Sequence, residues 1–183
     1  MPEPGPVKLK ICLVGEIAVG KTCLIKKYAF NQFSDNYICT IGTKVTKKKI
    51  KVENPKTDEP VDVHLLIWDI MGRKGLRHLL QQAYFFGAQG IIGVCDNTRE
   101  DTLLGLDDWI EDIQNVAAEI PTVLLGNKCD LEDDQEIGIG ELRSFASGYE
   151  KSAAYLSSAK TGFNVDRAFN IISKKILKDM YTL

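Results

Sequence analysis

One glycine-rich segment carries the residue types that bind phosphate: Gly15-Glu16-Ile17-Ala18-Val19-Gly20-Lys21-Thr22, with the spacing G-x-x-x-x-G-K-T. An apolar run precedes it and a helical pattern follows, so a strand leads into the loop and a helix N-terminus points at the same place. We expect backbone N–H groups to surround phosphate oxygens, Lys21 to contact the β- and γ-phosphates and the Thr22 hydroxyl to bind Mg²⁺. The sequence therefore predicts a nucleoside polyphosphate site made by Gly15, Ile17, Ala18, Val19, Gly20, Lys21, Thr22 and Cys23.

An acidic residue stands at the end of the third apolar run, in Ile67-Trp68-Asp69-Ile70-Met71-Gly72. A carboxylate that ends a strand beside a phosphate loop can hold Mg²⁺, usually through water. Gly72 has no side chain, so a backbone N–H can approach the γ-phosphate there. This D-x-x-G pattern alone is a weak signal, but its position one hairpin after the phosphate loop predicts the metal side of the same site.

Two later strand ends carry residues suited to a purine base. The first reads Gly126-Asn127-Lys128-Cys129-Asp130, and the Asp130 carboxylate can accept both the ring N–H and the exocyclic amine of guanine, a pair that adenine does not offer. We expect Asn127 to brace neighbouring loops and the Lys128 stem to cover one face of the base. The second strand end is followed by Ser158, Ala159 and Lys160, where the Ala159 N–H meets the guanine oxygen. Adenine-specific alternatives, a P-loop kinase or ATPase, would need a different base reader.

These motifs fall where strands and helices alternate. Apolar runs predict strands at 7–14, 43–53, 61–68, 89–95, 121–126 and 153–157, and helical periodicity predicts helices at 21–31, 74–86, 102–117, 138–147 and 164–180. The proline-marked turn at 54–60 favours an antiparallel hairpin. The pattern predicts an α/β fold with a six-stranded, mostly parallel sheet, one antiparallel edge strand and helices on both faces. Ligands of such sheets bind at the carboxyl ends of the strands.

Composition sets the broad class of the chain. Its 183 residues with a net charge of −2 suit a single domain, expected at 7–181 after a disordered tail at 1–6, and give no global reason to expect nucleic acid. The 5 cysteines have no C-x-x-C spacing, which favours reduced thiols in a cytoplasmic protein over disulfides or zinc. The two histidines, His64 and His78, lack a metal-spaced partner and are interpreted as structural.

Taken together, these residues resemble the small Ras-like GTPases, P-loop proteins with a G domain, over roughly residues 7 to 180. The string Ala83-Tyr-Phe-Phe-Gly-Ala-Gln-Gly-Ile-Ile92 and the segment Thr40-Ile41-Gly42 are similar to the Rab branch, while Thr43-Lys44-Val45 departs from the usual Rab V-D-F. The resemblance implies a switch that binds GTP or GDP with Mg²⁺ and hydrolyses GTP. Effector, exchange-factor and activating proteins would bind through the segments 33–45 and 70–82.

The resemblance also implies roles for single residues. Thr40 would bind Mg²⁺ with its hydroxyl and the γ-phosphate with its backbone N–H, which adds it to Thr22 and Asp69 as a metal ligand. Phe33 matches an aromatic residue that packs edge-on against guanine, and Tyr37 matches one that closes over the γ-phosphate. Lys21, Thr40, Gly72 and Arg73 would contact the reacting phosphate.

Two positions depart from the family in ways that affect chemistry. Arg73 stands where the family places a glutamine that orients the attacking water, and an arginine has no acceptor for that task. We expect slow intrinsic hydrolysis, which holds equally if Arg73 is a solvated loop residue. The alternatives are that Arg73 acts as an arginine finger in cis, or that the protein is a GTP-loaded scaffold with little turnover. Ile17 replaces a glycine and argues against Ras-style insertion of an activating arginine, while other modes of assisted hydrolysis and a purely structural role in packing over the loop stay open.

Membrane attachment is the last departure. The family usually ends in prenylated cysteines, whereas this sequence ends in Lys178-Asp-Met-Tyr-Thr-Leu183, and Pro2 excludes N-myristoylation. We therefore expect no lipid anchor within this sequence: either the protein is soluble, with peripheral membrane contact through a partner, or a lipidated tail has been trimmed from the sequence. We also expect a monomer. The lysine run Lys47-Lys48-Lys49-Ile50-Lys51 and the lysines at 174, 175 and 178 are interpreted as solvated faces.

Overall fold

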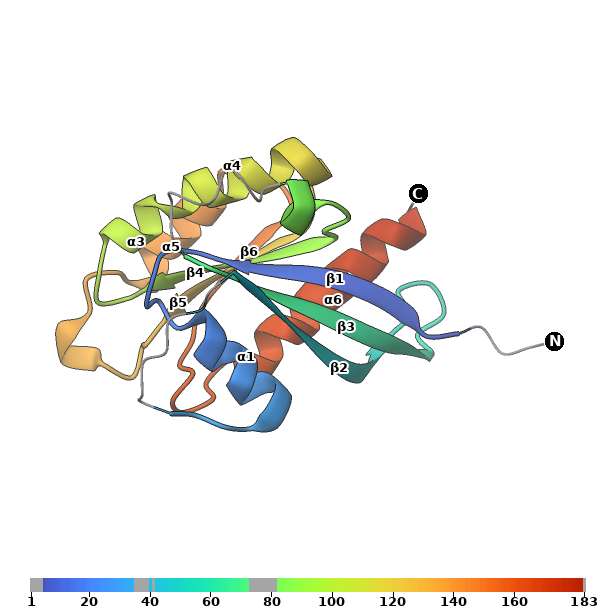
Figure 1. Ribbon diagram of the computed structural model, residues 1–183, viewed down its shortest axis with the longest axis horizontal. Helices are drawn as coiled ribbons and strands as arrows, with labels where there is room; N and C mark the ends of the chain where they lie inside the picture. Colours follow the sequence, from blue (N-terminus) through green and yellow to red (C-terminus); the bar gives the residue numbers. More distant parts are fainter. Residues whose placement is uncertain (1–4, 35–39, 41, 73–81, 183) are drawn as a thin grey trace.

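A six-stranded sheet runs through the part of the chain that the computed structural model describes, residues 5–34, 40, 42–72 and 82–182 (Figure 1). The strands lie in the order β2-β3-β1-β4-β5-β6. Their bounds are β1 Val7–Val14, β2 Thr43–Glu53, β3 Pro60–Ile70, β4 Gly90–Asp96, β5 Thr122–Asn127 and β6 Ser152–Leu156. The central strand β4 is buried along its whole length, as expected for a strand covered on both faces.

Strand direction follows the connections between strands. β2 and β3 pair antiparallel, with Glu53 opposite Pro60, because only the short turn between them separates the two strands. The other neighbouring pairs, β1 with β3 and β4, β5 with β4 and β6, are parallel. The predicted mostly parallel sheet with one antiparallel edge strand is therefore confirmed.

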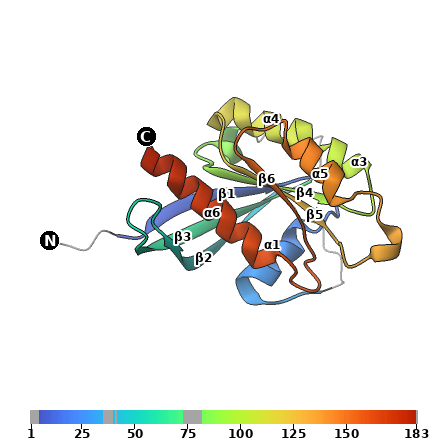
Figure 2. The same cartoon turned by 180° about the vertical axis from the view of Figure 1, so that it is seen from behind.

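Helices cover both faces of this sheet (Figures 1 and 2). Helices α1 (Lys21–Phe30) and α6 (Val165–Thr182) pack on one face. Helices α3 (Asp101–Leu104), α4 (Leu106–Ala117) and α5 (Ile139–Ala146) pack on the other, and a short 3₁₀ helix, η1, spans Glu132–Asp134. No helix among the described residues is long and apolar enough to cross a membrane.

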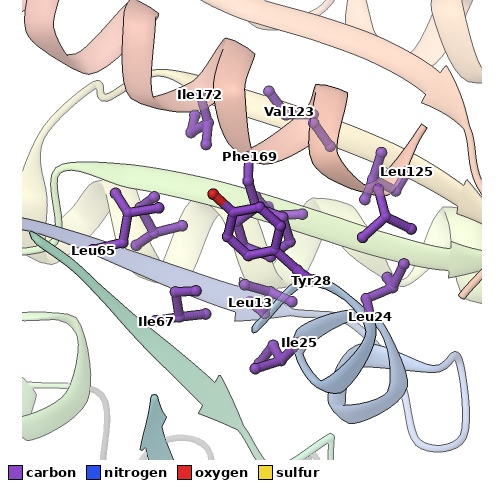
Figure 3. Close-up of a cluster of buried hydrophobic side chains, with 14 of the residues drawn as sticks. Leu13, Leu24, Ile25, Tyr28, Leu65, Ile67, Val123, Leu125, Phe169 and Ile172 are labelled. Atoms are coloured by element: carbon purple, nitrogen blue, oxygen red, sulfur yellow. The ribbon is translucent and has the colours of Figure 1, made fainter. Parts of the chain in front are cut away.

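A stacked aromatic pair joins the two helices of the first face. The rings of Tyr28 in α1 and Phe169 in α6 lie 3.9 Å apart, between centroids, at an interplanar angle of 4°. Aliphatic side chains from β1, β3 and β5 surround the pair, among them Leu13, Leu65 and Leu125 (Figure 3). Alternation along each strand sends these residues to one face and the next ones to the other. This packing holds α1, the helix that follows the phosphate loop, against α6 and the sheet.

One predicted helix is corrected by the structure, and another lies mostly outside the described residues. The helix predicted at 102–117 is two helices, α3 and α4, which meet at Gly105. A Cβ at Gly105 would lie 2.9 Å from the Glu16 Oε1 atom, so the side chain of this phosphate-loop residue lies against the junction. Of the helix predicted at 74–86, residues 82–85 are helical and 73–81 lie outside the described residues.

Candidate functional site

The carboxyl ends of the strands open onto a cavity of about 440 Å³. Loops that follow β1, β3, β5 and β6 form its wall, as expected for a doubly wound sheet. Most of the predicted site residues meet here: Ile17, Ala18, Gly20, Lys21, Thr22, Cys23, Phe33, Thr40, Gly72, Asn127, Lys128, Asp130, Ala159 and Lys160 all line the cavity. The sequence motifs, up to 143 residues apart between 17 and 160, therefore form one site.

The phosphate loop holds its lysine over the loop backbone. Lys21 is 7% exposed, and its Nζ atom donates hydrogen bonds to the carbonyl oxygens of Gly15 at 2.7 Å and Glu16 at 2.8 Å. These contacts place the ammonium group inside the loop, next to the first turn of α1. A fixed cation at a helix N-terminus makes the site electropositive and suited to phosphate.

At two positions another part of the chain comes so close to the backbone that only a glycine fits. Gly20 has φ +101°, and a Cβ there would lie 2.3 Å from the Asn127 Nδ2 atom. A Cβ at Gly72 would lie 2.7 Å from the Ile17 backbone nitrogen, so the chain after β3 passes directly against the phosphate loop. Neither position tolerates a side chain without moving the loop.

Three oxygen-bearing side chains converge at the start of α1. The Thr22 hydroxyl donates to Asp69 Oδ2 at 2.5 Å, and the Thr22 and Thr40 hydroxyl oxygens lie 3.0 Å apart. Asp69 is 2% exposed, and its second oxygen, Oδ1, has no hydrogen-bond partner among the described residues. Burial raises the pKa of Asp69, and the hydrogen bond from Thr22 and the charge of Lys21 only partly oppose this effect. Two hydroxyls and a carboxylate are hard oxygen donors, which fits Mg²⁺.

Asn127 links the base side of the cavity to the phosphate loop. Its Nδ2 atom donates to the Val19 carbonyl at 2.9 Å, and its Oδ1 atom accepts from the Ala159 amide at 3.1 Å. The side chain is 1% exposed. One amide group therefore fixes the loops after β1, β5 and β6 relative to one another.

Lys128 and Asp130 lie on the same wall of the cavity. Lys128 has φ 64°, and its Nζ atom forms an ion pair with Asp96, which ends β4 and is buried. Burial alone would raise the pKa of Asp96, but hydrogen bonds from Lys128 and Thr98 outweigh it and hold this pKa below its ordinary value. Asp96 is thus an anion that anchors the base-side loop.

Some predicted residues lie behind the wall rather than on it. Gly15 and Val19 contribute carbonyl oxygens to Lys21 and Asn127, and the Ser158 hydroxyl accepts a hydrogen bond from the Thr161 amide at 3.0 Å. Tyr37 and Arg73 lie outside the described residues.

The sequence analysis missed several residues of the site. Lys26, Ser34, Ile70 and Leu131 also line the cavity. Asp96, the last residue of β4, and Arg99, which follows the strand, support the wall from outside, since Arg99 pairs with Asp96 and donates to the Ile17 carbonyl. The rule that functional groups gather at the carboxyl ends of parallel strands would have found Asp96. No local signal points to the contact of Arg99 with Ile17.

Comparison with known proteins agrees with this geometry. A model of the Ras family matches residues 10–178. The chain belongs to the Ras family. It is 34% identical to Ras-related protein Rab-13 of Mesocricetus auratus over 169 aligned residues, and the alignment covers 92% of this chain and 79% of that protein. It is 33% identical to Ras-related protein Rab-2B of Dictyostelium discoideum over 93% of this chain and 81% of that one. GTP-binding protein ypt2 of Schizosaccharomyces pombe is 31% identical over 93% and 82% of the two chains.

Membership of the Ras family fixes the general activity. The chain is a small GTPase of the Rab type that binds GTP and GDP with Mg²⁺ and acts as a switch. Proteins of this family interact with effectors, exchange factors and activating proteins. The predicted resemblance and the predicted nucleotide and metal are thereby confirmed.

Proposed function

We propose that this GTPase hydrolyses GTP slowly and that the residues around the cavity divide the work of binding it. The convergence of Thr22, Thr40 and Asp69 beside Lys21 carries the proposal, because it provides hard oxygen ligands next to a phosphate-binding cation. When bound, Mg²⁺ neutralises charge on the phosphates. Thr22, Thr40 and Asp69 are its ligands in this proposal, Asp69 through water.

The remaining residues hold the nucleotide. Lys21 contacts the β- and γ-phosphates and Gly72 the γ-phosphate, while loop amides from Ile17 to Cys23 surround the phosphate chain. Asp130 accepts the guanine N–H groups, and the stems of Lys128 and Lys160 flank the base. The Ala159 N–H, which donates to Asn127 Oδ1 in the structure, is shared with the guanine oxygen in this proposal. Phe33 packs at the edge of the base, and Tyr37 closes over the γ-phosphate.

Slow hydrolysis follows from the residue after Gly72. An arginine side chain carries donors only, so Arg73 cannot accept a hydrogen bond from the attacking water as a glutamine does. The GTP state then lasts until a partner supplies the missing group. We further propose that residues 7–181 act as a monomeric single domain in the cytoplasm, that partners bind segments 33–45 and 70–82, and that a partner can bring the domain to membranes.

Single-turnover hydrolysis tests the role of Arg73. The chain is loaded with GTP and Mg²⁺, and the appearance of GDP is followed for the unaltered protein, for Arg73→Gln and for the control Lys74→Gln. We expect Arg73→Gln to hydrolyse GTP about tenfold faster or more, and Lys74→Gln to match the unaltered rate, because only the first places an acceptor beside Gly72.

The opposite result would change the proposal. A slower Arg73→Gln variant would mean that Arg73 stabilises charge on the γ-phosphate in cis. No detectable turnover in the unaltered protein, even with a partner that accelerates the glutamine variant, would favour the GTP-loaded scaffold.

A further inference from the structure

A buried aspartate outside the nucleotide motifs holds two cations from different loops. Asp96 is 1% exposed at the end of β4, and its Oδ2 atom contacts the Lys128 Nζ atom and lies 3.2 Å from the Arg99 Nε atom. The Arg99 guanidinium reaches further, and its Nη2 atom donates to the Ile17 carbonyl at 3.0 Å. A chain of contacts thus runs from the base-side loop through Asp96 and Arg99 to the phosphate loop.

Because the peptide bond is planar, the hydrogen bond from Arg99 to the Ile17 carbonyl also sets the direction of the Ala18 N–H. In a trans peptide the C=O and the following N–H point in opposite directions, and the described residues contain no cis bond. Arg99 holds the Ile17 carbonyl from outside the loop. The Ala18 N–H of the same peptide is therefore directed to the other side, where Ala18 lines the cavity.

The conformation of Ala18 makes outside support necessary. Its φ is 63°, in the left-handed region that residues with a Cβ seldom adopt. Such a backbone persists only where its surroundings impose it. The hydrogen bond from Arg99 to the Ile17 carbonyl acts on the peptide that leads into Ala18, and the Glu16 side chain lies against Gly105 at the junction of α3 and α4.

The same contact strengthens the amide as a donor. A cation that hydrogen-bonds to a carbonyl polarises the peptide, and hydrogen bonds in a chain reinforce one another. The Ala18 N–H facing the cavity is then a better partner for a phosphate oxygen. Asp96 keeps the guanidinium in place while balancing part of its charge.

We propose that Arg99 is a positioning residue for phosphate binding, which acts by holding the Ile17–Ala18 peptide with the Ala18 N–H toward the phosphates. This rests on the proposed assignment of the loop amides to the phosphate chain. Arg99 touches no nucleotide in this scheme. Its effect is on affinity for the phosphates, and the reading of guanine by Asp130 is independent of it.

The experiment compares two diphosphates in three proteins. Affinities for GDP and for inosine diphosphate, which lacks the exocyclic amine, are measured with Mg²⁺ for the unaltered chain, Arg99→Ala and Arg99→Lys. We expect Arg99→Ala to lose about tenfold in affinity for both nucleotides, because a charge-assisted hydrogen bond that orients a ligand-binding amide is lost. The ratio of the two affinities stays unchanged. Arg99→Lys, which keeps a cationic donor, loses less.

A spectroscopic readout separates positioning from general support of the fold. In the GDP complex of Arg99→Ala, the ¹⁵N and amide ¹H resonances of Ala18 shift upfield, and the thermal midpoint of the nucleotide-free protein stays that of the matched control Arg143→Ala. Arg143 lies exposed on α5, away from the cavity.

Several outcomes would overturn the proposal. One is an unchanged affinity for GDP in Arg99→Ala, and another is a loss of GDP affinity in Arg99→Lys as large as in Arg99→Ala. A third is a fall in the ratio of GDP affinity to inosine diphosphate affinity in Arg99→Ala, which would place the effect of Arg99 at the base. Failure of the unaltered chain to bind GDP would instead remove the nucleotide site itself. The two failures are therefore distinguishable.

Discussion

At the scale of single residues, Asn127 shows how one side chain can hold a ligand site together. Its amide spans the gap between the phosphate loop and the loop after β6, with a donor used on one side and an acceptor on the other. Both partners are backbone groups, whose position does not depend on rotamer choice. The side chain is buried, so water cannot replace it at either partner.

Replacing Asn127 with alanine is therefore expected to destabilise the protein even without nucleotide. The Val19 carbonyl and the Ala159 N–H would each lose a buried partner, and leaving such groups unsatisfied costs about 1–3 kcal/mol apiece. We expect the free energy of unfolding of Asn127→Ala, measured by urea denaturation of nucleotide-free protein, to fall by about 2–4 kcal/mol. The control is Asn115→Ala, an exposed asparagine on α4. Equal values for both variants would show that Asn127 contributes nothing to stability on its own.

At the scale of elements, three neighbouring strands place cations around a histidine. Lys49 of β2 and Lys8 of β1 stand in register on either side of His64 of β3. This is the face of the sheet opposite α6, because the neighbouring Val63 and Leu65 pack in the cluster with α6. Burial lowers the pKa of His64 first, and the charges of Lys47, Lys49 and Lys8 lower it further, against a smaller opposite effect of Asp62. His64 is therefore neutral at a pH where an ordinary histidine is partly charged.

Changing the sign of one neighbour should move this titration. Lys49→Glu replaces a charge that disfavours the imidazolium with one that favours it, so the pKa of His64 is expected to rise. The measurement is the pH dependence of the His64 ring proton resonances by NMR. Lys56→Glu, in the turn between β2 and β3, is the matched control and should leave them unchanged, because Lys56 is not among the charges that act on His64. An equal rise in both variants would point to a general field effect rather than to the cross-strand pair.

Elements and site differ in how far the sequence predicts them. Apolar runs place all six strands, and the glycine, lysine and carboxylate at strand ends place the site, since both are local patterns. The break at Gly105 was missed because the helical periodicity continues across it and the backbone of Gly105 itself stays in the helical region. The link from Arg99 to Ile17 crosses 82 positions, and no spacing in the sequence encodes such a contact.

At the scale of the whole molecule, the nucleotide cavity joins parts of the chain that are distant in sequence. Its walls come from the loops after β1, β3, β5 and β6, while the stack of Tyr28 on Phe169 joins α1 to α6 (Figure 3). A ligand that contacts all of these loops binds the folded chain and not the unfolded one. Stability and nucleotide binding are therefore coupled through mass action.

This coupling predicts a large and selective thermal shift. With GDP and Mg²⁺ at about 1,000 times the dissociation constant, the folded state gains about 4 kcal/mol, which for a chain of this size raises the thermal midpoint by about 8–16 °C. ATP with Mg²⁺ at the same concentration is expected to give almost no shift, because the proposed partner of the base, Asp130, offers only an acceptor where adenine has no matching pair of N–H groups. Adding EDTA to the GDP sample should remove much of the gain, since Thr22 and Asp69 then lose the ion that joins them to the phosphates.

Circular dichroism melts of the unaltered chain and of Asp130→Ala would check this prediction. The alanine variant should lose most of the GDP shift while its melt without nucleotide stays the same, because the Asp130 side chain lies on the cavity wall and not in the core. If ATP stabilised the unaltered chain as much as GDP does, the loop after β5 would not be reading the base. The cavity would then bind nucleotides through the phosphate loop and Mg²⁺ alone.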